Sequence, residues 1–152
     1  MGSVVTKVIG HAPCNVLIVP RKANIECKTV LVATDGSDHS VAETSAAISM
    51  ASQCGGELTA ISVVERTGEE VEAKANVNNV VEMAQREGMA VKTLTPTGRS
   101  HEAIAEAAGG MGADLIVMGA LGKTLLKRFF VGSTTEKVVG SAGCAVLVVN
   151  AS

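Results

Sequence analysis

Five short apolar runs alternate with segments of helical periodicity along this chain, and this alternation restricts the possible folds more than any other feature. The runs lie at residues 29–33, 57–64, 91–95, 115–118 and 145–149. Strands that alternate with helices form parallel sheets through right-handed crossovers, with helices on both faces. The 152 residues include no Trp or Tyr, so aliphatic side chains must build the core, as they do in buried parallel sheets. The sequence therefore predicts a doubly wound, Rossmann-like α/β fold with a five-stranded parallel sheet.

The polarity of each run predicts its place in that sheet. Runs 29–33 and 115–118 are the most uniformly apolar and belong at the centre, whereas run 91–95 alternates, meets a proline and belongs at an edge. With the runs numbered one to five along the chain, the order 3-2-1-4-5 meets both conditions. Ligands of open α/β sheets bind at the carboxyl ends of the strands where this order reverses. Here that position lies between strands one and four, which lead to Asp35 and Gly119.

The segments between the runs predict helices at about residues 39–54, 67–87, 100–111 and 133–140. In the first of these helices, Ala42, Ala46 and Met50 form an apolar stripe at helical spacing. Ser37 and Asp38 stand where the first of these helices begins, and Ser100 stands where the third begins. Ser and Asp are favourable N-caps, so we expect Ser37 or Asp38 to cap the first helix and Ser100 to cap the third.

An internal repeat divides the chain. Residues 2–19 match residues 132–149, with Gly, Ser, Lys, Val, Cys and Leu recurring in register. Only one helix–strand unit is repeated, which argues against a solenoid. We therefore expect residues 1–20 to be the remnant of a preceding repeat, residues 21–27 a linker and residues 28–152 the complete domain.

The last run is wholly apolar, although the strand order places it at an edge of the sheet. An uncovered apolar edge strand tends to pair with other chains. We therefore expect residues 145–149 to be covered, either by residues 15–19 of the N-terminal segment or by a strand of a second subunit.

The fourth run leads into a glycine-rich stretch whose pattern suits phosphate binding. Gly119 and Gly122 follow the run, and nine residues later Gly132, Ser133 and Thr134 open a helix. Glycines let the backbone approach an anion closely, and a helix start offers unpaired N–H groups. A P-loop is excluded because the glycine that it requires five positions before Gly122 is here a valine within the strand. The alternative is a tight turn at the glycines and an ordinary N-cap at Ser133.

These motifs resemble the universal stress protein family, in its ATP-binding branch. The resemblance covers residues 28–150 and rests on the Gly-x2-Gly-x9-Gly-Ser pattern and on the Thr-Asp-Gly-Ser that follows the first strand. It implies a nucleotide site formed by ten residues: Ala33, Thr34, Asp35, Val63, Met118, Gly119, Gly122, Gly132, Ser133 and Thr134.

Within that site, the resemblance implies separate roles. Gly122 and residues 132–134 hold the phosphates, Gly119 lies against the ribose, and the backbone of Val63 meets the adenine edge. Asp35 faces the ribose or a phosphate-bound Mg²⁺. The loop that carries Lys123, Lys127 and Arg128 either adds positive charge near the phosphates or is solvated.

Composition excludes several other functions. A net charge of −2 and the lack of aromatic stacking platforms argue against nucleic-acid binding. No apolar run is long enough to span a membrane, so we expect a cytoplasmic protein without membrane contacts. The four cysteines lack C-x-x-C spacing and the three histidines are dispersed, so we expect neither a disulfide nor a protein-built metal site.

Together these observations predict an ATP-binding regulatory protein of the stress response, with or without Mg²⁺, that forms a homodimer or a tandem pair through residues 145–149. No nucleophile, general base or carboxylate pair is placed for catalysis, so we expect no catalytic residues. Two alternatives remain open: an ATP-hydrolysing or AMP-forming enzyme of the same fold, and an interaction module that binds no nucleotide.

Overall fold

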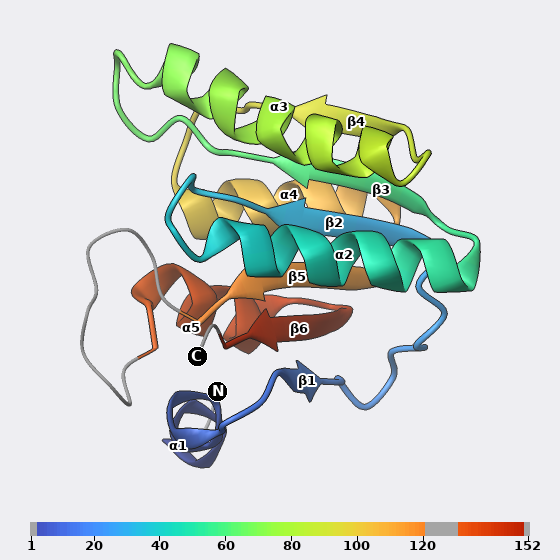
Figure 1. Cartoon of the computed structure of the whole chain (residues 1–152). Helices are drawn as coiled ribbons and strands as arrows, with labels where there is room; N and C mark the ends of the chain where they lie inside the picture. Colours follow the sequence, from blue (N-terminus) through green and yellow to red (C-terminus); the bar gives the residue numbers. More distant parts are fainter. Residues whose placement is uncertain (1–2, 121–130, 151–152) are drawn as a thin grey trace.

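The computed structural model describes residues 3–120 and 131–150 and contains a central sheet with helices on both faces (Figure 1). In chain order the elements are α1 (Ser3–His11), β1 (Val16–Ile18), β2 (Thr29–Ala33), α2 (Ser40–Cys54), β3 (Glu57–Ile61), α3 (Glu70–Arg86), β4 (Val91–Leu94), α4 (Ser100–Met111), β5 (Leu115–Gly119), α5 (Ser133–Ser141) and β6 (Ala145–Val149). Every predicted run and helix corresponds to one of these elements. None of the described helices is long and apolar enough to cross a membrane.

The sheet contains six strands in the order β1-β6-β5-β2-β3-β4. Strands β2 to β6 run parallel to one another, and β1 joins β6 in the antiparallel direction. The predicted five parallel strands are therefore present, and the N-terminal helix–strand unit adds β1 beyond β6 as a sixth, antiparallel strand, so the sheet as a whole is mixed. The other five strands keep the predicted relative order, with β2 beside β5 and β4 at an edge.

Two hydrophobic cores lie on opposite faces of the sheet because successive side chains of a strand alternate in direction. Val30 and Val32 belong to the core beneath α2 and α3, and Leu31 and Ala33 belong to the core beneath α4 and α5. Three of these four side chains are fully buried. Burial on both faces explains the continuous apolar run in β2 and fixes the position of its carboxyl end.

The predicted N-caps are wrong for two helices. The N-cap of α2 is His39 and that of α4 is Arg99, and neither side chain makes a capping hydrogen bond. Asp38 therefore stands one residue too early to cap α2. The Ala103 N–H donates to the Arg99 carbonyl at 2.9 Å, so Ser100 already lies within α4 and cannot be its cap.

The pairing of β1 with β6 confirms that the N-terminal segment covers the last strand. The partners are Val16 with Val148, Leu17 with Leu147, and Ile18 with Val146. Since residues 2–19 repeat as residues 132–149, Leu17 pairs with its own repeat counterpart, and the antiparallel register relates the strands β1 and β6 by a local two-fold axis. Asn150, which follows β6, stabilises the pairing of β1 with β6, because its Nδ2 donates to the Cys14 carbonyl at 2.8 Å.

Candidate functional site

A cavity of about 330 Å³ opens at the carboxyl ends of β2 and β5, where the strand order reverses. This volume is at the lower end of the range for small-molecule sites. Nine of the ten residues predicted for the site line the cavity: Ala33, Thr34, Asp35, Val63, Met118, Gly119, Gly132, Ser133 and Thr134. Gly122 and the basic residues at positions 123, 127 and 128 lie outside the described residues. The structure thus gathers residues from separate strand ends and one helix start around one cavity.

The start of α5 forms one wall of the cavity. The helix begins at Ser133, with Gly132 as its N-cap. The Gly132 N–H donates to the Ala120 carbonyl at 2.7 Å, so this N–H is already used. Among the described residues, the N–H groups of Ser133 and Thr134 have no backbone acceptor. These N–H groups lie at the positive end of the helix dipole and are available to an anion.

Two buried side-chain hydrogen bonds, which the sequence did not predict, fix other parts of the wall. Thr135 Oγ1 donates to the Gly119 carbonyl at 2.6 Å and ties α5 to the end of β5. Asn76 Nδ2 of α3 donates to Ser62 Oγ at 3.1 Å. Gly36, at a φ of +74°, packs so closely on Asn76 that a Cβ there would overlap the amide oxygen. Thr135 and Asn76 therefore position the backbone on which the cavity is built.

The backbone at Val63 has free hydrogen-bonding groups. The residues on either side are engaged, since the Ser62 N–H donates to Leu94 at 3.1 Å and the Val64 N–H donates to Pro96 at 2.8 Å. Among the described residues, no backbone group pairs with the N–H or the C=O of Val63. This edge of the cavity therefore offers one donor and one acceptor to a ligand.

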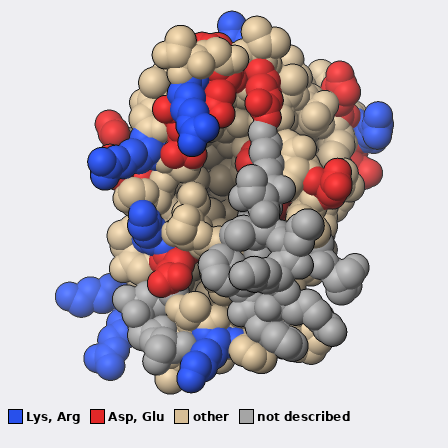
Figure 2. Space-filling model, turned by 90° about the vertical axis from the view of Figure 1, so that its left-hand side faces the viewer, with Lys and Arg blue, Asp and Glu red and all other residues tan. Residues whose placement is uncertain are grey.

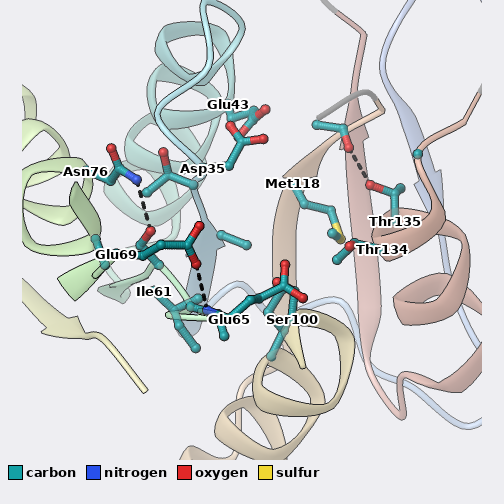
Figure 3. A pocket seen from close by; sticks show the side chains of 18 of the residues that line it. Asp35, Glu43, Ile61, Glu65, Glu69, Asn76, Ser100, Met118, Thr134 and Thr135 are labelled. Carbon is teal, nitrogen blue, oxygen red and sulfur yellow. Dashed lines mark hydrogen bonds between the residues drawn. The ribbon is translucent and has the colours of Figure 1, made fainter. Parts of the chain in front are cut away.

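Glu43 is the main cavity residue that the sequence interpretation missed. It projects from the first turn of α2, is only 3% exposed, and lies beside Asp35 (Figure 3). Burial raises the pKa of the Glu43 carboxyl to about 8, and the negative charge of Asp35 adds to the increase. A Cβ at Gly119 would overlap the Glu43 carboxylate. Gly119 is thus required to leave room for a buried acid, whatever it does for a ligand.

The spacing of residues in α2 could have indicated that Glu43 is buried. The predicted stripe of Ala42, Ala46 and Met50 is only partly buried, and the fully buried face lies one position further along the chain. Ala47 is completely buried, and Glu43 precedes it by four residues, which places both side chains on one face. A helical wheel centred on Ala47 would have placed Glu43 on the buried face of the helix.

The described part of the cavity wall is acidic. Asp35, Glu43, Glu65, Glu69 and Glu72 line it, and no described lining residue is Lys, Arg or His. Figure 2 shows the hollow in this face of the molecule with Asp and Glu side chains near it. The carboxylate of Glu69 is partly engaged, since its Oε1 accepts the Glu65 N–H at 3.0 Å. The three basic residues that the sequence places either near the phosphates or in a solvated loop, at positions 123, 127 and 128, lie outside the described part of the chain.

The architecture defines the class of protein. It is a doubly wound α/β domain with a cavity at its switch point, which is the position at which open α/β sheets place their ligand sites. The universal stress protein family model matches residues 26–150. The chain therefore belongs to the universal stress protein family.

Individual relatives agree with this assignment. A universal stress protein of Methanocaldococcus jannaschii is 36% identical over 138 residues, which cover 80% of this chain and 81% of the relative. A universal stress protein structure from Archaeoglobus fulgidus matches with a TM-score of 0.81 at 26% identity, over 98% of this chain but only 55% of that chain. A universal stress protein solved in complex with cAMP matches with a TM-score of 0.70 at 26% identity, over 82% of this chain and 98% of that chain.

Proposed function

We propose that this protein binds an adenine nucleotide, with ATP as the ligand, in the cavity at the ends of β2 and β5. The observation that carries the proposal is the gathering of nine predicted site residues around one cavity at the switch point. The complex of a similar universal stress protein with cAMP supports an adenine ligand. Binding would bias the conformation or assembly of the protein and so make it a nucleotide-dependent regulator in the stress response.

The free backbone groups suggest the orientation of the nucleotide. The adenine edge, which carries both donors and acceptors, is placed at Val63, where one donor and one acceptor are unpaired. The phosphates are placed at the free N–H groups of Ser133 and Thr134, together with Gly122. The ribose then lies between them, near Gly119 and Asp35.

We propose binding without turnover. Carboxylates are the only titratable side chains among the described lining residues, and the carboxylates of Asp35 and Glu69 accept backbone N–H groups. The enzymatic alternative, in which ATP is cleaved, is distinguished by a steady-state assay for ADP or AMP. Release of either product at a rate that scales with protein concentration, and that disappears in a Gly132→Val variant, would establish the enzymatic alternative.

We also propose that residues 1–20 are the last helix and strand of a preceding copy of the domain, joined by residues 21–27 to the domain at 28–152. Val8 of α1 is 50% exposed, whereas its repeat counterpart Val138 is completely buried. A neighbouring domain packed on α1 would bury Val8 in the same way. Because β6 is already paired with β1 in this chain, this proposal favours tandem pairing over a homodimer formed through β6.

The nucleotide proposal is tested by thermal unfolding of the full chain with ATP, GTP, CTP and UTP. A ligand present at 100 times its Kd stabilises the folded state by about 2.7 kcal/mol, which raises the Tm by several degrees for a domain of this size. We expect this increase with ATP and a smaller one with the other nucleotides. Equal Tm values with and without all four nucleotides would contradict the proposal.

A further inference from the structure

Two of the four cysteines meet at the end of the sheet opposite to the cavity. The parallel strands β2 and β3 begin with Thr29 paired to Glu57, so the segments that enter these strands also run side by side. Cys27 precedes β2, and Cys54 is the last residue of α2, which leads into β3. Cys27 belongs to the hydrophobic core beneath α2 and α3, and Cys54 packs against the same core.

Backbone contacts hold the two segments against each other. The Glu57 N–H donates to the Lys28 carbonyl at 2.8 Å. Lys28 Nζ donates to the Cys54 carbonyl at 2.8 Å, where the chain enters β2 beside the end of α2 (Figure 1). Gly56 packs so closely on Cys27 that a Cβ at position 56 would overlap the Cys27 carbonyl. Neighbouring strands lie about 4.8 Å apart, a spacing within the roughly 4.4–6.8 Å between the Cα atoms of disulfide-bonded cysteines.

The two thiols are in contact across this junction. The Cys27 thiol forms a side-chain hydrogen bond with Cys54. Burial raises the pKa of the Cys27 thiol to about 11, and the contact with Cys54 adds to the increase. Cys27 is 3% exposed, whereas Cys54 is partly exposed. An oxidant from solvent therefore reaches Cys54 first, while Cys27 stays a protonated thiol beside it.

The backbone conformation of Cys27 is unusual. Its φ is +53°, and it is the one non-glycine residue with a positive φ among residues 3–120 and 131–150. This region is unfavourable for a residue that carries a Cβ, and glycine or asparagine is its usual occupant. A cysteine that is kept there, in contact with a second cysteine, indicates a use for the side chain itself.

The other two cysteines are not placed to compete for this pairing. Cys144 packs against the core on the opposite face of the sheet, beneath α4 and α5. Cys14 is exposed and follows α1. The pairing of Cys27 with Cys54 could not be predicted from C-x-x-C spacing, because the fold rather than the local sequence brings these two residues together.

We propose that Cys27 and Cys54 form a redox modification site, which hydrogen peroxide converts into a reversible disulfide. The Cys54 sulfur attacks one peroxide oxygen, the O–O bond breaks, and Cys54 becomes a sulfenic acid. The other peroxide oxygen leaves as water with the Cys54 thiol proton. The Cys27 sulfur then attacks the Cys54 sulfur, the S–O bond breaks as the S–S bond forms, and a second water leaves with the Cys27 thiol proton. Two thiols are thus oxidised and one peroxide is reduced.

The disulfide would close a loop that contains β2, α2 and the turn between them. It would join the last residue before the domain to the end of α2. A crosslink of this kind stabilises a protein mainly by restricting the unfolded chain. We therefore expect oxidation to raise the Tm of the domain by several degrees.

The test is peptide mapping of the full-length protein after treatment with hydrogen peroxide. Free thiols are alkylated in denaturant, and the chain is digested with trypsin without reductant. Cleavage after Lys and Arg places each cysteine in a separate peptide, with Cys27 in residues 23–28 and Cys54 in residues 29–66. We expect these two peptides to be joined in most of the protein, and dithiothreitol to separate them and to reverse the rise in Tm.

Two variants provide the controls. Cys144→Ser removes another partly buried cysteine and should retain both the joined peptides and the rise in Tm. Cys54→Ser should lose both, and its Cys27 should remain a free thiol.

The peptide map of the unsubstituted protein decides the question even if a variant does not fold. Separate peptides 23–28 and 29–66, with Cys54 oxidised to a sulfinic or sulfonic acid, would overturn the proposal. So would a disulfide between Cys54 and Cys14 of a second molecule. A mixture of pairings equal to that of protein oxidised in urea would show that the fold does not select this pair, and would also overturn it.

Discussion

Gly119 and Glu43 depend on each other at the scale of single residues. The sequence interpretation assigned Gly119 to ligand approach, but the structure shows that the glycine also makes room for the Glu43 carboxylate. The role of Glu43 was not predicted because a glutamate in a helix is exposed by default. Its direction depends on which face of α2 packs on the sheet, and the two overlapping Ala stripes of α2 left that choice open.

The steric relation predicts the result of adding one methyl group. We expect Gly119→Ala to lower the free energy of unfolding by about 1–3 kcal/mol, as overpacking does in other buried sites. Glu43→Ala in the same chain removes the obstructing carboxylate, so the double variant should recover most of the loss in urea unfolding.

A matched control separates the steric effect at position 119 from any general effect of a Gly→Ala substitution on the free energy of unfolding. Gly109 in α4 has open space around its Cβ position, and Gly109→Ala should stabilise the helix by about 0.5–1 kcal/mol. If Gly119→Ala is as stable as the parent chain, or if the double variant recovers nothing, the contact between Gly119 and Glu43 does not constrain the site.

At the scale of elements, the apolar pattern of the strands predicted their positions in the sheet, whereas the residue types at the helix starts did not predict the N-caps. The wholly apolar run at 145–149 indicated a covered edge, and β1 covers it. The polar alternation of run 91–95 indicated an edge strand, and β4 is one. The N-cap predictions were wrong because the N-cap is the residue at which the chain enters the helix. A shift of one position, as between Asp38 and His39, changes which side chain can cap the helix.

The attachment of α1 and β1 is predicted to depend on Asn150. Its Nδ2 donates to the Cys14 carbonyl at 2.8 Å, and its backbone N–H donates to Asn15 Oδ1 at 3.0 Å. Asn150→Ala leaves the carbonyls at the end of α1 without this donor, at a cost of about 1–2 kcal/mol. We therefore expect amide hydrogen exchange in residues 3–18 to become about 5–30 times faster.

Exchange elsewhere provides the comparison for that experiment. The amides of β2 and β5 lie in the centre of the sheet and should exchange at unchanged rates. Asn78→Ala, on an exposed position of α3, should leave the N-terminal segment unaffected. Unchanged exchange in residues 3–18 of the Asn150→Ala variant would show that other contacts hold the unit in place.

At the scale of the whole molecule, the strand order determines where the ligand site lies. The alternation of runs and helices was sufficient to predict the central strands and their switch point, and the cavity opens there. The charge of the cavity could not be predicted, because its acids come from segments far apart in the sequence, such as Asp35 and Glu72. We therefore propose that the switch-point cavity is a nucleotide site.

The measurement that tests this claim most directly is the Kd of ATP for the full chain, determined by calorimetry with Mg²⁺ present. We predict micromolar binding that becomes at least about 30-fold weaker, a loss of about 2 kcal/mol, when Gly122→Val and Gly132→Val are combined. The control combines Gly109→Val with Gly110→Val on the exposed side of α4, with folding of both variants checked by circular dichroism. Loss of ATP binding in the cavity variant alone is the predicted result. Unchanged ATP affinity in a folded cavity variant would contradict the claim.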